Sequence, residues 1–273
     1  MSMSVMIVAA LLLISAMAVA WAVRLRTGSS GWIDTIWSAA VGLAGLVAAL
    51  GAAGGGRRWM IAGLIVLWSG RLALHIGART RGAADDPRYA ELERQWGGAF
   101  RFRLFLFLQI QAAVGLILAF AVHLAAGARA PFPGPIDGLA AAVVIAGIAG
   151  EALADAQLRR FRASAPAGSV CDAGLWGWSR HPNYFFEWLV WCGFALFALA
   201  GIGDRPGQIL AIAAPVTMWV LLVHVSGIPP LEAHMAKTRA DAFLAYAARV
   251  SPFVPRPPRP APARTAAHLE ESP

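Results

Sequence analysis

The chain has 273 residues, of which 58% are hydrophobic and only 14% are charged. Soluble domains carry about a quarter charged residues, so this composition excludes an ordinary water-soluble domain and predicts an integral membrane protein. The formal net charge is +8, but the cations are divided between loops, so we expect no nucleic-acid partner.

Seven apolar segments are long enough to cross the hydrocarbon core, which takes about 20 helical residues. We place them at residues 4–23, 32–52, 59–78, 104–126, 136–158, 184–202 and 207–226. A charged helix is expected at 231–248, and the Pro-rich composition of 252–273 predicts an extended or disordered tail. The expected fold is therefore an all-α membrane domain with seven transmembrane helices over residues 1–251.

The basic residues predict the orientation of these spans. Eighteen of the 23 Lys and Arg residues follow the first, third, fifth and seventh spans, and only four lie in the loops on the other side. By the positive-inside rule the N-terminus is outside and the C-terminus cytoplasmic. We expect a monomeric, multi-pass protein of the cell inner membrane, in contact with membrane lipids.

Three ionisable residues in the second and third spans are candidate catalytic residues. Asp34 is either a helix cap at the interface or an acid at the mouth of a substrate cavity. Arg71 and His75 are four residues apart and share one helix face. An Arg at that depth is costly, so it faces a wet or ligand-filled interior unless it reaches the headgroups or pairs with a buried carboxylate.

Four charged residues stack on one face at the end of the fifth span: Glu151, Asp155, Arg159 and Arg162. They could form salt bridges within the helix. However, two adjacent carboxylates repel one another unless donors come from elsewhere, and Arg suits phosphate. We therefore favour a ligand. The histidines lack metal-ligand spacing, so no metal site is expected.

The segment 174–188 combines aromatic, cationic, amide and carboxylate side chains in one short span. Asn183 and Glu187 are four apart near a helix N-terminus, where Arg180 also favours an anion. An amide and a carboxylate on one face can bracket a carboxamide. The alternative is an aromatic belt followed by an ordinary helix cap.

This segment, Gly-Leu-Trp-Gly-Trp-Ser-Arg-His-Pro-Asn-Tyr-Phe-Phe-Glu, resembles the signature of bacterial DUF1295 membrane proteins, which are placed in the steroid 5-alpha-reductase C-terminal superfamily. The likeness extends to residues 31–37, 86–89 and 226–232. The resemblance implies a seven-span helical fold that binds NADPH between its cytoplasmic loops and helices.

The resemblance also implies roles for individual residues. Asn183 and Glu187 match an Asn-x-x-x-Glu motif near the nicotinamide. Asp155 and Arg162 match an Asp and an Arg, seven residues apart, that hold the ribose and phosphate. Glu151 stands where the steroid reductases have Asn.

Other positions match only part of the family. Arg180 and His181 match the more distant members that carry an Arg-His-Pro sequence. Tyr246, followed nine residues later by a proline, resembles the closing Tyr and Pro of the family. On the substrate side the steroid enzymes use a Gln-Glu pair and a Tyr, whereas this chain has Asp34 and Trp68. The expected cofactor-binding residues are Glu151, Asp155, Arg159, Arg162, Arg180, His181, Asn183, Tyr184, Glu187 and Tyr246.

The resemblance implies an NADPH-dependent reductase that acts on a lipophilic enone or alkene, such as a steroid-like or isoprenoid lipid. Hydride from the nicotinamide would attack the β-carbon while an acid stabilises the enolate. Asp34 would be this acid, assisted by Arg71 or His75.

The alternative is an S-adenosylmethionine-dependent membrane methyltransferase similar to the isoprenylcysteine carboxyl methyltransferases. Those enzymes carry an Arg-His-Pro-x-Tyr turn, here Arg180 to Tyr184, and Glu232 would suit them as a downstream acid. They usually lack the carboxylate that is Glu187 here, and they have no need for Asp155 with Arg162. Those three residues therefore favour the reductase.

Overall fold

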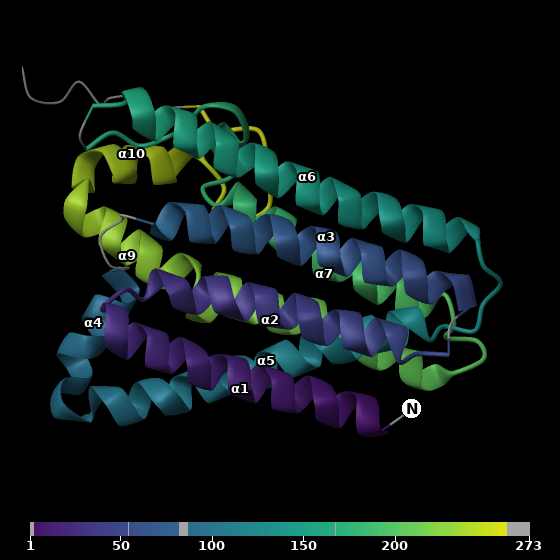
Figure 1. The fold of residues 1–273 in the computed structure, drawn as a ribbon. Coiled ribbons are helices and arrows are strands. Elements are labelled where there is room, and N and C mark those ends of the chain that lie inside the picture. The colour runs from purple at the N-terminus through teal and green to yellow at the C-terminus, as the bar shows by residue number, and fades with distance from the viewer. Residues whose placement is uncertain (1–2, 54, 82–86, 167, 261–273) are drawn as a thin grey trace, which may run out of the picture.

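A computed structural model describes residues 3–53, 55–81, 87–166 and 168–260, and across these ranges its regular elements are helices (Figure 1). The α-helices are α1 (Met3–Thr27), α2 (Gly31–Leu50), α3 (Gly55–Thr80), α4 (Pro87–Trp96), α5 (Phe100–Ala126), α6 (Pro135–Ser164), α7 (Pro182–Leu199), α8 (Ala213–Val220), α9 (Ile228–Thr238) and α10 (Ala240–Arg249). The shorter helical turns include η2 (Gly174–Gly177), η3 (Pro206–Ile212) and the π-helix η4 (Leu221–Val225).

Six helical stretches are long and apolar enough to cross a membrane: α1, α2, α3, α4 with α5, α6, and the continuous stretch from η3 to α9. This confirms the prediction of an all-helical protein and supports the multi-pass membrane assignment. The seventh span and the orientation stay predictions, because α7 is not among the six. α7 has 18 residues, begins with Pro-Asn-Tyr and carries Glu187.

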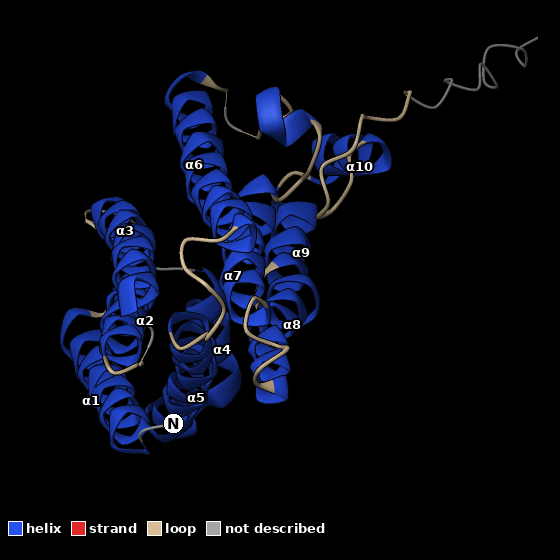
Figure 2. Ribbon diagram, turned by 90° about the vertical axis from the view of Figure 1, so that its right-hand side faces the viewer, coloured by secondary structure: helices blue, strands red, loops and turns tan. Residues whose placement is uncertain are grey.

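The long helices lie side by side, with α2 packed against α3 and α6 against α7 (Figures 1 and 2). α5 contacts α1, α2 and α7 and so connects the two pairs. Figure 1 shows α4, α9 and α10 gathered at one end of the bundle, while the N-terminal end of the chain lies at the other. The C-terminal ends of α3 and α6, which carry Arg79 and Arg162 in their last turns, lie at the same end as α10.

Glycines allow the paired helices to approach closely, as small residues do in membrane bundles. A Cβ on Gly147 of α6 would lie 2.9 Å from the Phe186 oxygen and 3.0 Å from the Val190 nitrogen of α7. A Cβ on Gly42 of α2 would lie 1.9 Å from the Ser69 hydroxyl of α3. The spacing of these pairs therefore depends on positions that have no side chain.

A buried ion pair closes the end of the bundle opposite α10. Arg57, with 1% of its side chain exposed, donates to both carboxylate oxygens of Asp137 at 2.7 and 2.9 Å. It also donates to the carbonyl oxygens of Ala130 and Pro131, both at 3.1 Å. These bonds join the start of α3 to the connection between α5 and α6, which makes Arg57 a structural residue.

The segment after α10 is held in place from residue 252, where the sequence predicted an extended or disordered tail. Ser251 forms an isolated parallel bridge with Ser179, and its carbonyl accepts from the Arg180 backbone N–H at 2.8 Å. Phe253 is buried. Residues 252–260 therefore have a defined place, because their backbone supplies partners for the segment before α7. Residues 261–273 of the predicted tail lie outside the described residues.

Candidate functional site

Ionisable residues from three helices meet in a largely buried group that we term the Arg71 cluster: Arg71, His75, Glu151, Asp155 and Glu187. Arg71 of α3 reaches α6, where its Nη1 lies 2.7 Å from Oε2 of Glu151 and its Nη2 donates to Asp155. His75, one turn further along α3, lies 3.4 Å from Oδ2 of Asp155. The side chains of Glu151 and Asp155 are only 6% and 8% exposed.

Glu187 of α7 is the fifth residue of the cluster and is bound by two tryptophans. Its two oxygens accept hydrogen bonds from the indole N–H of Trp68 at 2.7 Å and of Trp191 at 2.9 Å. The two indole rings pack edge to face with centroids 4.9 Å apart, which fixes both donors. The carboxyl groups of Glu187 and Glu151 are close enough to interact, so two acids adjoin in the interior.

One contact in the cluster is incomplete. Nη1 of Arg71 and Oε2 of Glu151 lie at ion-pair distance, yet both atoms are buried and neither has a hydrogen bond of good geometry. A buried polar atom without a hydrogen bond is costly, and native structures contain few of them, so this pair needs an explanation. A ligand hydroxyl or amide could bond both.

Exposed arginines extend the cluster toward the end of the bundle. Arg79 at the end of α3 and Arg159 and Arg162 at the end of α6 are exposed. Arg162 is within electrostatic range of Arg79 and of Arg239, and His75 is within range of Arg79 and Arg159. Cations from the ends of α3 and α6 and from the junction of α9 with α10 therefore lie within electrostatic range of one another, and such a group suits an anion such as a phosphate.

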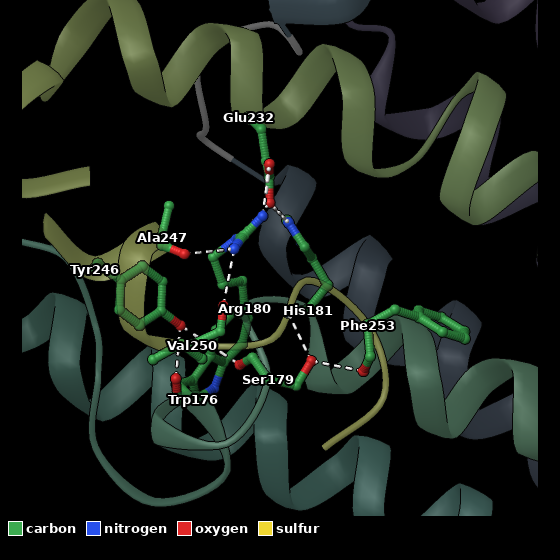
Figure 3. Close-up of polar contacts among 9 residues, drawn as sticks. All are labelled: Trp176, Ser179, Arg180, His181, Glu232, Tyr246, Ala247, Val250 and Phe253. Carbon is green, nitrogen blue, oxygen red and sulfur yellow. Dashed lines mark hydrogen bonds and ion pairs between the residues drawn. The ribbon is translucent and has the colours of Figure 1, made fainter. Parts of the chain in front are cut away.

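A second group, which we term the Arg180 network, lies just before α7 and contains Ser179, Arg180, His181, Glu232 and Tyr246 (Figure 3). Arg180 donates to both oxygens of Glu232, at 2.7 and 3.1 Å, and to the carbonyl oxygens of Val250 at 2.8 Å and Ala247 at 3.1 Å. Nε2 of His181 lies 2.9 Å from the same Glu232 carboxylate. The network joins α7, α9 and α10.

Tyr246 and Ser179 add bonds to backbone groups in this network. The Tyr246 hydroxyl donates to the carbonyl oxygen of Trp176 at 2.6 Å, and burial raises the pKa of this phenol. The Ser179 hydroxyl donates to the Phe253 carbonyl at 2.8 Å and accepts from the His181 N–H at 3.1 Å. These residues thereby fix the turn that leads into α7.

The two groups are neighbours along α6. The Trp176 indole donates to the Ala154 carbonyl at 2.9 Å, and the side-chain oxygen of Gln157 accepts from the Leu175 N–H at 3.0 Å. Asp155 lies between these two contacts in the sequence. The Arg180 network thus holds the turn before α7 against the helix that supplies the carboxylates of the Arg71 cluster.

The structure brings some of the predicted site residues together and separates others. Arg71, which was expected either to face a ligand or to pair with a carboxylate, does the latter: it donates to Asp155 and lies at ion-pair distance from Glu151. Arg180, His181 and Tyr246 belong to the Arg180 network, where most of their polar atoms are occupied by protein groups.

Other predicted residues lie at the edge of these groups. Asp34 forms an ion pair with Arg88 of α4 at 2.8 Å. Asn183 and Tyr184 are half-buried in the first turn of α7, and the Tyr184 ring stacks on His181 with centroids 5.5 Å apart. Sequence reasoning missed Trp191 as a partner of Glu187, although their spacing of four residues places both on one face of α7.

Comparison with known families identifies the chain's relatives. Residues 20–250 match a family model described as a protein of unknown function, DUF1295. The chain belongs to the DUF1295 family. The matched region of this DUF1295 protein contains the Arg71 cluster and all five residues of the Arg180 network. No curated protein and no solved structure gives a significant match.

Proposed function

We propose that this DUF1295 protein is a membrane-embedded, NADPH-dependent reductase of a lipophilic enone or alkene, such as a steroid-like or isoprenoid lipid. The main support for the proposal is the Arg71 cluster. Burial of ionisable side chains between apolar helices costs free energy, and such residues generally serve a function. The placement of the family in the steroid 5-alpha-reductase superfamily, to which its signature points, is consistent with this proposal.

The residues present fit the chemical groups of NADPH. Exposed Arg159 and Arg162 suit its phosphates, and Asp155 can accept a hydrogen bond from a ribose hydroxyl. Asn183 offers an amide near the N-terminus of α7 for the carboxamide, and Glu151 has a buried oxygen without a hydrogen bond. When bound, NADPH would supply a hydride.

The Arg71 cluster would contribute charge stabilisation and a proton. Arg71 can stabilise negative charge on a substrate oxygen, as a fixed cation does in a water-excluded site, and the His75 imidazole can donate a hydrogen bond to that oxygen. Glu151 and Glu187 adjoin, and because two neighbouring buried anions repel, one carboxyl group can retain a proton for the substrate. Asp34, the other candidate acid, is paired with Arg88. We place this site at the cytoplasmic face, as the positive-inside rule predicts.

Thermal unfolding of the purified protein in neutral detergent tests the nucleotide class. We expect NADPH to raise the midpoint, because a ligand that binds only the folded state stabilises it. NADH should raise it less, since it lacks the 2′-phosphate that arginines recognise. A shift with S-adenosylmethionine and none with NADPH would overturn the proposal.

One observation favours the methyltransferase as the second candidate. Glu232, the downstream acid of the Arg-His-Pro-x-Tyr turn, contacts both Arg180 and His181 at 2.7 and 2.9 Å. The turn and its acid therefore form one unit, which would suit a methyltransferase of this type. The reductase is favoured because the Arg71 cluster has no role in the methyltransferase alternative.

A further inference from the structure

A small cavity of about 180 Å³ lies between the end of α10 and the segment that follows it. Its lining includes four arginines, namely Arg180, Arg249, Arg256 and Arg259. In Figure 2 the loop after α10 passes beside that helix before it leaves the bundle. The cavity is separate from the Arg71 cluster, because none of the cluster residues lines it.

The charges around this cavity are poorly balanced. Arg180 is neutralised by Glu232, but Arg249 has only a long contact of 3.3 Å with Asp172, whose side chain is 56% exposed. Arg256 and Arg259 have no ion pair within the described part of the chain. The lining itself contains no carboxylate. Cations held together in this way repel one another, and an anion in the cavity would relieve the repulsion.

The backbone holds the arginines in place around the cavity. The Arg256 N–H donates to the Trp178 carbonyl at 2.9 Å, and the Arg259 N–H donates to the Arg249 carbonyl at 2.9 Å. Pro252 and Pro257 also line the cavity, and proline fixes its own φ angle. The site therefore exists before a ligand binds, which lowers the entropic cost of binding.

Apolar side chains next to the cavity indicate which anion it takes. Trp178, whose carbonyl holds Arg256, is 51% exposed, and Val254, between Pro252 and Arg256, is 42% exposed. Tryptophan is favoured at the membrane surface, and arginines near an anionic leaflet attract lipid phosphates. We propose that this cavity binds the phosphate group of an anionic membrane lipid through Arg249, Arg256 and Arg259.

The test uses the full-length protein, delipidated in neutral detergent, and counts bound lipids by native mass spectrometry. Phosphatidylglycerol is the probe, and phosphatidylcholine is the matched zwitterionic lipid. In the test variant Arg249, Arg256 and Arg259 are replaced by Gln. The control replaces three exposed arginines elsewhere, Arg101, Arg129 and Arg205, by Gln, so that both variants lose the same charge.

We expect the wild type and the control to bind phosphatidylglycerol at least about tenfold more tightly than the test variant. A second variant, with Arg256→Lys and Arg259→Lys, should keep intermediate affinity and show that charge rather than folding is responsible. Equal affinity in the test and control variants would overturn the proposal.

Two further probes separate lipid from soluble ligands. Inorganic phosphate should not displace the lipid at equal concentration. If inorganic phosphate bound to the cavity and phosphatidylglycerol did not, the ligand would be a soluble phosphate and not a lipid. NADPH should bind the test variant as it binds the wild type. Loss of NADPH binding there would assign the cavity to a nucleotide instead, whereas failure of NADPH to bind any form would affect only the proposed function.

Discussion

At the scale of single residues, Arg71 carries a positive charge into the contact between α3 and α6, where the carboxylates of Glu151 and Asp155 meet it. Removal of one partner from a buried ion pair leaves an uncompensated charge, which typically costs about 3–5 kcal/mol. We expect Arg71→Met to lower the free energy of unfolding by about this amount in a denaturant titration. The exposed Arg79 on the same helix is the matched control, and Arg79→Met should change it by less than about 0.5 kcal/mol. Equal effects would show that the cluster is not a buried unit.

Tyr246 gives a pH-dependent prediction. Burial raises the pKa of its phenol, whereas in the unfolded chain a tyrosine ionises near pH 10. Its contribution to stability is therefore complete below about pH 10 and is lost as the pH rises further. Tyr246→Phe should lower stability by about 1–3 kcal/mol at neutral pH, because the Trp176 carbonyl loses its donor. The variant should also lose less stability between pH 9 and about pH 11, measured by thermal unfolding; a slope equal to that of the wild type would contradict the burial of Tyr246.

These residues show what sequence spacing can predict. The spacing of four residues placed Arg71 with His75, and Glu151 with Asp155, on shared helix faces. It could not show that the two faces meet, because the pairing of α3 with α6 depends on packing between distant segments. Asp34 was one of several acids near a span, and only the position of α4 determines that it pairs with Arg88.

At the scale of helices, the contact between α6 and α7 depends on glycine. A Cβ at Gly147 would meet backbone atoms of α7 at 2.9 and 3.0 Å, whereas a Cβ at Gly138 on the same helix meets nothing within 4 Å. We expect Gly147→Ala to destabilise the protein by about 1–3 kcal/mol, since the helices must separate. Gly138→Ala should be neutral or slightly stabilising. Thermal unfolding of both variants checks this, and a neutral Gly147→Ala would contradict the close packing.

The helices also show where composition is insufficient for prediction. Runs of apolar residues predicted the long helices within a few residues. The Pro-rich composition after residue 252 predicted an extended or disordered tail. Hydrogen bonds accepted by the Ser251 and Phe253 carbonyls and donated by the Arg256 and Arg259 N–H groups place that segment. Such bonds cannot be predicted from composition, because they use backbone groups that nearly every residue has.

At the scale of the whole molecule, the seven-span topology requires α7 to cross the membrane. Ala163 and Asp204 are exposed positions on either side of α7. In a background with Cys171→Ala and Cys192→Ala, a cysteine at either position can be labelled with an impermeant maleimide on intact cells. We expect labelling at position 204, and labelling at 163 only after permeabilisation. Labelling of both from one side would contradict the seven-span topology.

The proposed cofactor site is tested most directly by the affinity for NADPH, measured by calorimetry on the protein in lipid nanodiscs. We expect the wild type to bind NADPH more tightly than NADH. Arg162→Gln should weaken NADPH binding about tenfold or more and reduce that preference, because a guanidinium is lost from the phosphate region. Arg205→Gln, at the other end of the bundle, should bind as the wild type does. Binding of S-adenosylmethionine without binding of NADPH, or an Arg162→Gln affinity equal to the wild type, would contradict the account.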